Sequence, residues 1–109
     1  PVLVIDCAAF LPDGFACLKE LLNTPSEKIF HNARFDLQFL MGIGIDCFPV
    51  FDTMLAAQLL RPCGGPLKAG LAVVADHYLG IKLDKTEQTG SWDSASLTGS
   101  QLAYAALDA

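Results

Sequence analysis

Residues 28–36 read Lys-Ile-Phe-His-Asn-Ala-Arg-Phe-Asp, and this stretch indicates most about the fold. Apolar residues Ile29 and Phe30 predict a short strand over Lys28–His31, because residues of these types are frequent in strands. Asn32 is a favourable N-cap, so a helix should follow the strand directly. Three apolar residues at helical spacing mark one face of that helix, which we predict over Phe35–Leu40.

The sequence on both sides of this stretch continues the alternation of strands and helices. Strands are predicted over Val2–Ile5 and Phe48–Phe51, and Asp52 or Thr53 should cap the helix after the second one. Further helices are predicted around Phe15–Leu22, over Leu67–Tyr78 with a stop at Gly80, and over Gln101–Leu107 behind a Thr98–Gln101 capping box. Alternating strands and helices predict an α/β domain whose sheet is at least partly parallel.

Length and composition restrict the class of protein. A chain of 109 residues with 52% hydrophobic and 17% charged residues suits one small folded domain and excludes disorder. Charged residues interrupt every apolar run, so no membrane span is predicted, and we expect a cytoplasmic protein. The net charge of −5 argues against a general basic surface for phosphates. It argues less against an enzyme that binds cations through carboxylates, since the cations then supply positive charge.

The four cysteines do not predict a metal site. Cys7, Cys17, Cys47 and Cys63 are scattered, with no Cys-x-x-Cys pair and no histidine at ligand spacing. We interpret Cys7, Cys17 and Cys47, which have apolar neighbours, as reduced core residues.

Two acidic residues and a tyrosine are the candidates for chemistry. Asp36 lies in the first turn of its predicted helix, and Tyr104 and Asp108 lie one turn apart on one face of the last helix. A divalent cation would compensate for carboxylates in such apolar surroundings. Taken singly, each residue also has a structural interpretation. Asp36 would then complement the helix dipole, Tyr104 and Asp108 would form a solvated pair, and the nearby Phe35 would belong to the core.

Five separated blocks favour the chemical interpretation when they are taken together. They are His-Asn-x-x-Phe-Asp (31–36), Phe-Asp-Thr-Met (51–54), Lys-Thr-Glu-Gln (85–88), the Trp at 92 and Tyr-Ala-Ala-x-Asp-Ala (104–109). In order and spacing they resemble the DEDD-type 3′–5′ exonucleases of the tyrosine subclass. That family includes the proofreading domain of DNA polymerase I and the ribonuclease D group. The resemblance implies a ribonuclease-H-like fold in which four acids bind two divalent ions, Mg²⁺ or Mn²⁺.

The resemblance also implies a role for each candidate residue. Asp36 corresponds to the acid of the second motif, Asp108 to that of the third, and Tyr104 to the tyrosine that orients the attacking water. Asn32, Arg34 and Phe35 would lie beside the terminal nucleotide. The implied substrate is the 3′ end of single-stranded DNA or RNA, and the implied products are nucleoside 5′-monophosphates.

One departure from the family is large. Its first motif, Asp-x-Glu, occurs nowhere in the 109 residues. We therefore interpret residues 1–109 as a single exonuclease domain that is truncated at its N-terminus and lacks the first strands and the first catalytic motif. Such a fragment should be inactive alone, and one edge of its partial sheet should be unusually exposed.

Two other interpretations stay open at this stage. One is a degenerate exonuclease domain that serves as a structural or nucleic-acid-binding unit. The other is a small acidic α/β interaction module, which no positive feature favours. An upstream Asp-x-Glu would decide for the enzyme. The sequence leaves open whether the substrate is DNA or RNA, and whether a polymerase domain follows in the same chain.

Overall fold

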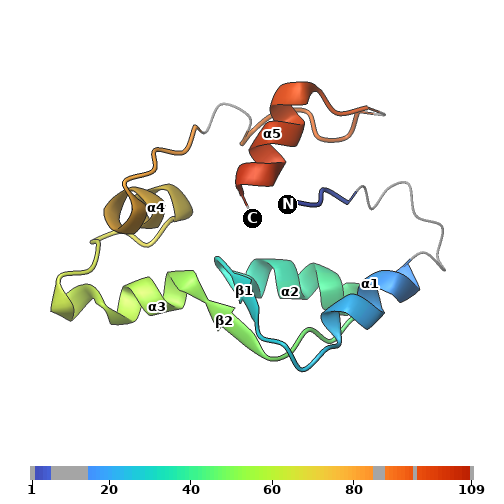
Figure 1. The fold of residues 1–109 in the computed structure, drawn as a ribbon, viewed down its shortest axis with the longest axis horizontal. Helices are drawn as coiled ribbons and strands as arrows, with labels where there is room; N and C mark the ends of the chain where they lie inside the picture. The colour runs from blue at the N-terminus through green and yellow to red at the C-terminus, as the bar shows by residue number, and fades with distance from the viewer. Residues whose placement is uncertain (1, 6–14, 85–87, 95, 109) are drawn as a thin grey trace.

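The computed structural model describes residues 2–5, 15–84, 88–94 and 96–108 (Figure 1). Five helices and two strands follow one another in these residues. In chain order they are α1 (Phe15–Leu22), β1 (Lys28–Phe30), α2 (Ala33–Gly42), β2 (Val50–Asp52), α3 (Thr53–Leu59), a 3-10 turn (Arg61–Cys63), α4 (Leu71–Leu79) and α5 (Gly99–Leu107).

The centre of the fold is a β1–α2–β2 unit with parallel strands. Lys28 pairs with Val50, and Phe30 pairs with Asp52 at the other end of the register. Because the strands are parallel, their carboxyl termini lie at the same end of the sheet. Helix α2 begins just after β1, and α3 begins directly after β2, so the first turns of both helices lie at that end. The predicted α/β class is confirmed here.

The predicted strand at Val2–Ile5 is wrong. These residues have no regular secondary structure, and Val2, Leu3 and Val4 keep 60%, 78% and 41% of their surface exposed. A β-branched run becomes a strand only when a partner satisfies its backbone groups, and β1 and β2 are the only paired strands in the described residues. One edge of each of these two strands therefore has no strand beside it within the described part of the chain.

The buried core is small and consists mainly of small side chains. Among the described residues the core members are Ala33, Ile45, Cys47, Ala57, Ala69 and Ala75, with Gln101 as a buried polar residue. The radius of gyration is 15.6 Å, whereas about 13 Å is usual for a compact domain of this length. Many large apolar side chains are exposed, including Phe35 and Phe39 at 59% and 65%. Phe35 was a core residue in the structural interpretation, and instead it packs edge to face against Phe39 on the surface of α2.

The cysteine predictions have mixed outcomes. Cys47 is buried as predicted, whereas Cys17 is exposed, because no residue of α1 is buried in the described structure. Cys7 lies outside the described residues.

The helix ends follow local sequence signals in most places. Thr98 and Gln101 form the predicted capping box, and Gly80 ends α4 with a positive φ of 67°. Helix α4 starts at Leu71 instead of Leu67, because Gly70 is in an extended conformation before it. Helix α5 ends at Leu107, with Asp108 as its C-cap. No described helix is long and apolar enough to cross a membrane.

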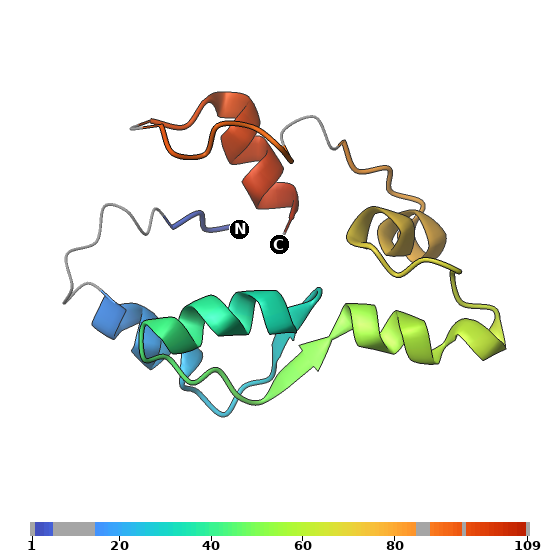
Figure 2. The same cartoon turned by 180° about the vertical axis from the view of Figure 1, so that it is seen from behind.

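Helix α5 comes back to the β1–α2 region although it is the last element. In Figures 1 and 2 its C-terminal end points toward the place where β1 ends and α2 begins. This arrangement brings together the start of α2 and the end of α5, the two elements near which the candidate acids Asp36 and Asp108 lie.

Candidate active site

Asp36 and Asp108 line the same hollow, which has a volume of about 750 Å³. Its walls come from the end of β1, the first turns of α2 and α3, the start of α4, and the C-terminal end of α5. These two acids, which are distant in the sequence, therefore face one cleft.

The electrostatics of Asp36 reflect this arrangement. Partial burial raises its pKa most, a backbone hydrogen bond lowers it, and the negative charges of Asp108 and Asp52 raise it further. The net pKa lies above the ordinary value. A carboxylate whose pKa is raised partly by the charge of a second carboxylate in the same hollow belongs to a site that favours a cation.

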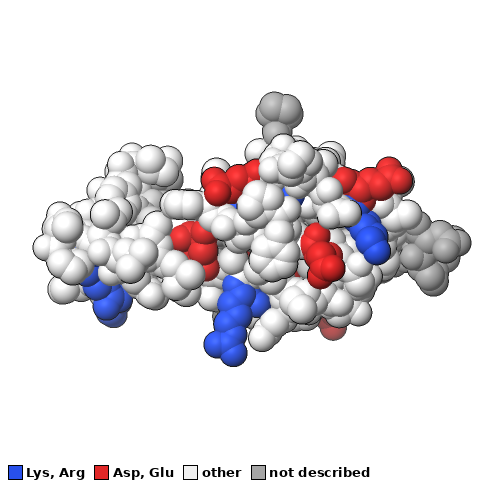
Figure 3. Space-filling view, turned by 90° about the horizontal axis from the view of Figure 1, so that it is seen from below, with Lys and Arg blue, Asp and Glu red and all other residues white. Residues whose placement is uncertain are grey.

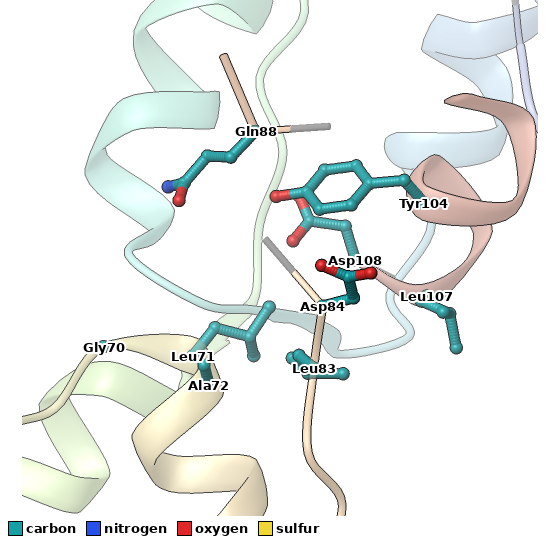
Figure 4. A pocket seen from close by; sticks show the side chains of 9 residues that line it. All are labelled: Gly70, Leu71, Ala72, Leu83, Asp84, Gln88, Tyr104, Leu107 and Asp108. Carbon is teal, nitrogen blue, oxygen red and sulfur yellow. The ribbon is translucent and has the colours of Figure 1, made fainter. Parts of the chain in front are cut away.

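Tyr104 lies in an adjoining pocket of about 150 Å³ that Asp108 also lines. Figure 4 shows the Tyr104 ring and the carboxylates of Asp108 and Asp84 in this pocket. The centroids of the Trp92 and Tyr104 rings are 5.9 Å apart, so the loop before α5 supports the phenol. Burial first, and then the charge of Asp108, raise the pKa of Tyr104 above its usual range. Tyr104 is therefore a neutral phenol at physiological pH, able to donate and accept hydrogen bonds.

The three residues expected beside a nucleotide do not all reach the hollow that Asp36 and Asp108 line. Asn32 and Phe35 line it, whereas Arg34 lines a different hollow of about 630 Å³ between α2, β2 and α3. Successive helical residues point about 100° apart, so Arg34 and Asp36 lie on well-separated faces of α2. Four of the six predicted site residues thus line one hollow, Tyr104 lines the adjoining pocket, and Arg34 lines neither.

The N-cap prediction for Asn32 needs a correction. Asn32 occupies the N-cap position of α2, but its side chain makes no capping hydrogen bond. Its backbone is left-handed, with φ 63°, whereas a capping side chain usually belongs to an extended residue. Asparagine tolerates this conformation better than most residues, which suits it to the sharp change from strand to helix.

The side chain of Asp52, and not that of Asn32, accepts hydrogen bonds at the start of α2, and it caps α3 as well. Its carboxylate accepts hydrogen bonds from the Met54 and Leu55 amides of α3, as the N-cap prediction requires. It also accepts hydrogen bonds from the Asn32 and Ala33 amides at the start of α2, which the sequence did not predict. Burial alone would raise the pKa of Asp52, but the four amide hydrogen bonds outweigh it and hold the pKa below its ordinary value.

His31 is fixed by a short chain of hydrogen bonds at the end of the sheet where β1 and β2 terminate. The Thr53 hydroxyl donates to the Phe30 carbonyl oxygen at 3.0 Å, and its oxygen lies 2.9 Å from His31 Nδ1. The hydroxyl proton is used on the carbonyl, so Thr53 must accept from His31 Nδ1–H. In the neutral ring, Nε2 is then an acceptor, and this buried atom has no hydrogen-bond partner among the residues that the structure describes.

Asp84 is a residue that sequence reasoning missed. It lines the pocket of Tyr104 and Asp108 from the segment after α4. The only signal was its position just before the Lys-Thr-Glu-Gln block, most of which (85–87) lies outside the described residues. Within the described residues, no group of three or more histidine, cysteine or acidic side chains is placed to hold a metal ion.

Charged residues do not form a continuous basic surface on the face seen in Figure 3. Lysine, arginine and acidic side chains are interspersed there among wide uncharged areas. This agrees with the net charge of −5, and it gives no support to nucleic-acid binding through a broad basic patch.

Comparison with known proteins identifies the class to which this fold and site belong. A family model described as 3′–5′ exonuclease matches residues 2–109. The chain is 37% identical over 91 residues to DNA polymerase I of Aquifex aeolicus, covering 84% of this chain and 15% of that protein. It is 38% identical over 93 residues to ribonuclease D of Escherichia coli, covering 84% of this chain and 24% of that one.

Solved structures agree. The structure of Brucella melitensis NrnC with bound Mg²⁺ matches with a TM-score of 0.72 and 33% identity, over 84% of this chain and 43% of that chain. The chain belongs to the 3′–5′ exonuclease family and is homologous to the exonuclease domains of DNA polymerase I and ribonuclease D. The predicted ribonuclease-H-like fold is confirmed in partial form, with two strands of the sheet described. The chain spans less than half the length of these relatives.

Proposed function

We propose that residues 1–109 are part of a metal-dependent 3′–5′ exonuclease of the DEDD type, tyrosine subclass. In the proposed longer protein, here called the parent protein, they follow an Asp-x-Glu motif. The observation that carries the proposal is the meeting of Asp36, from the start of α2, with Asp108, from the end of α5, in one hollow. Tyr104 lies in the adjoining pocket, and the chain belongs to a family of 3′–5′ exonucleases.

The two acids suit divalent cations. Their hard carboxylate oxygens are ligands that Mg²⁺ and Mn²⁺ prefer, and the charge of Asp108 makes an ionised Asp36 less favourable without a cation. A homologue, NrnC, has been solved with bound Mg²⁺. Asp36 and Asp108 would supply half of the ligands, and the upstream Asp-x-Glu the other half. Two such ions activate water at neutral pH and stabilise the leaving oxyanion of a phosphodiester.

The other residues of the hollow would bind and orient the substrate. The Tyr104 phenol would hold the attacking water by a hydrogen bond, since a tyrosine with a raised pKa is a poor general base. Phe35, which is 59% exposed at the edge of the hollow, offers an aromatic face on which a terminal base can stack. The Asn32 side chain can contact the same nucleotide. Arg34 is not part of this set, because it lines another hollow.

The proposed substrate is the 3′ end of single-stranded DNA or RNA. Relatives of this chain include both a DNA polymerase and a ribonuclease, so both substrates belong in the test.

The second candidate is a degenerate domain without catalysis. The described residues supply no cluster of three metal ligands, which agrees with both candidates, because the proposed enzyme would take its remaining ligands from the upstream motif. The upstream sequence separates the two candidates, because the enzyme requires an Asp-x-Glu there and the degenerate domain does not.

The test is digestion of 3′- and 5′-end-labelled single strands by the parent protein and by residues 1–109 alone. We expect the parent protein to release nucleoside 5′-monophosphates from the 3′ end with Mn²⁺ or Mg²⁺, and to stop when a chelator is added. Residues 1–109 should bind the metal weakly and hydrolyse neither DNA nor RNA, because magnesium gives up its water shell only to several strong ligands. Cleavage that survives the chelator would refute the proposal.

A further inference from the structure

The carboxylate of Asp52 contacts four backbone N–H groups from two helices. Oδ1 accepts from Met54 N at 2.8 Å, from Asn32 N at 3.1 Å and from Leu55 N at 3.4 Å. Oδ2 accepts from Ala33 N at 3.0 Å. An N-cap side chain normally serves the first turn of its own helix only. Asp52 therefore caps α3 and, about twenty residues away in the sequence, the start of α2 as well.

These four amides lie behind two walls of the hollow that contains Asp36. Asn32, Phe35 and Asp36 line it from the start of α2, and Thr53 and Met54 line it from the start of α3. Asp52 itself does not line this hollow and lies toward the neighbouring one. It is therefore placed to hold both walls without touching a substrate or a cation in the space between them.

Within the described residues, α2 has no other side-chain cap. The left-handed Asn32 makes no side-chain capping bond, and a helix whose first amides lack partners frays at that end. Asp36 is in that first turn. The position of its carboxylate consequently depends on the hydrogen bonds that the Asp52 carboxylate accepts from the amides of Asn32 and Ala33.

We propose that Asp52 is a positioning residue. By tying the first turns of α2 and α3 together, its carboxylate fixes the Asp36 side chain relative to Asp108 across the hollow. This inference rests on the proposed exonuclease function for its consequence in catalysis, but the tie itself is a structural statement that can be tested separately. The lowered pKa of Asp52, which follows from the four amide hydrogen bonds, keeps the tie ionised at neutral pH.

Two substitutions in the parent protein separate the two halves of the tie. Asp52→Ser keeps a good N-cap for α3, because serine is among the preferred N-cap residues. Its single short hydroxyl has no second oxygen for the amide of Ala33. Asp52→Asn preserves the size of the side chain and places an NH₂ group against one set of amides. If Asp52→Ser does not fold, Asp52→Asn replaces it and is judged by the same measurements.

The matched control is Cys47→Ala. Cys47 is 1% exposed between α2 and β2 and lines neither the Asp36 hollow nor its neighbour. Its truncation leaves a small cavity and lowers stability without removing a hydrogen bond of the tie. Each protein is assayed at the same interval below its own thermal midpoint, so that a general loss of stability affects all of them alike.

The kinetic readout is kcat against KM for a single-stranded substrate, with the Mn²⁺ half-saturation measured alongside. We expect Asp52→Ser to lower kcat by about ten- to a hundredfold, since small misplacements of a catalytic group have effects of this order. The KM for the nucleic acid should stay within about twofold, and Cys47→Ala should retain its kcat. An unchanged kcat in Asp52→Ser, or an equal fall in Cys47→Ala, would overturn the proposal.

Hydrogen exchange separates a failure of the tie from a failure of the proposed function. In Asp52→Ser the amide of Ala33, which loses its acceptor Oδ2, should exchange faster, whereas those of Met54 and Leu55 should stay protected. If the wild-type parent protein has no nuclease activity, the proposed function fails and exchange alone decides about the tie. Unaltered exchange at Ala33 would then overturn it.

Discussion

The two acids of the hollow are held in different ways. Asp36 belongs to a region fixed by hydrogen bonds between residues about twenty positions apart, such as those that the Asn32 and Ala33 amides donate to the Asp52 carboxylate. Asp108 ends a helix whose described anchors are local. They are the Thr98–Gln101 capping box and the hydrogen bond from Gln101 Nε2 to the Ser91 carbonyl oxygen at 3.0 Å.

This difference indicates which contacts maintain each half of the site, the half with Asp36 and the half with Asp108. The Asp36 half depends on the pairing of β1 with β2, which brings Asp52 beside the start of α2. The Asp108 half depends on short-range signals that α5 and the preceding loop carry by themselves. A substitution in one half should therefore leave the local structure of the other half intact.

The largest effect is expected where both halves meet. Asp108→Ala in the parent protein should remove nearly all exonuclease activity, because one of the two carboxylates that face the hollow within the described residues is lost. Removal of a residue at the centre of a catalytic constellation can cost several orders of magnitude in kcat. The measurement is end-labelled digestion at saturating Mn²⁺.

Asp76→Ala is the control for this prediction. Asp76 is an exposed acid of α4 that lines none of the three hollows described above. The substitution Asp76→Ala removes one negative charge from the protein, as Asp108→Ala does. Undiminished cleavage by Asp108→Ala, or an equal loss in Asp76→Ala, would contradict the assignment of Asp108.

A smaller effect is expected for the phenol on the Asp108 side. Tyr104→Phe should lower kcat by about ten- to a hundredfold, and it should leave the Mn²⁺ half-saturation unchanged, because the ring and both acids remain. Tyr78→Phe, which removes a hydroxyl from an exposed tyrosine of α4, should have no effect on either quantity. A shifted Mn²⁺ half-saturation in Tyr104→Phe would indicate that the phenol acts through the metal site instead.

The Asp36 half should be the more sensitive to acid. The pKa of Asp52 is lowered in the folded protein, so the folded state binds fewer protons than the unfolded state between the two pKa values. The stability from the tie is present above the ordinary aspartate pKa and is lost as pH falls through the lowered one. Asp52→Asn should thus be less stable than wild type near neutral pH, and the difference in stability should narrow as pH falls below the ordinary aspartate pKa.

Thermal midpoints of both proteins across this pH range provide the measurement. Asp93→Asn is the control, because the pKa of Asp93 is also lowered, by the Ser91 hydroxyl, on an exposed loop outside the tie. A difference between Asp52→Asn and wild type that does not change with pH would show that the charge of Asp52 is not what matters.

The smallest effect should come from the local anchor of α5. Thr98→Ala removes the side chain that accepts a hydrogen bond from Gln101 N at 3.2 Å, at a cost of about 1 kcal/mol in helix stability. Hydrogen exchange should show the first turn of α5 opening more often while the amides of Asn32 and Ala33 keep their rates. Faster exchange at those two amides would mean that the two halves are coupled more closely than the described contacts indicate.

Much of this arrangement was predictable, because its signals are local. The capping box at Thr98, the stop at Gly80 and the N-cap role of Asp52 for α3 each depend on residues within one helical turn. The grouping of Asp36, Tyr104 and Asp108 was predictable from the resemblance of separated blocks to one family. The strand at Val2–Ile5 was not, since a strand depends on a partner that the described residues do not provide.

The sequence by itself determined the order of the elements, the family and the residue types that face the hollow. Only the tertiary structure decided that Asp52 caps two helices, that Arg34 lines a different hollow from Asp36, and that Asp84 joins Tyr104 and Asp108. The physical reason is the range of the interactions. Propensities and caps act within a few residues, whereas the place of a side chain across a parallel strand pair depends on register and on hydrogen bonds between distant segments.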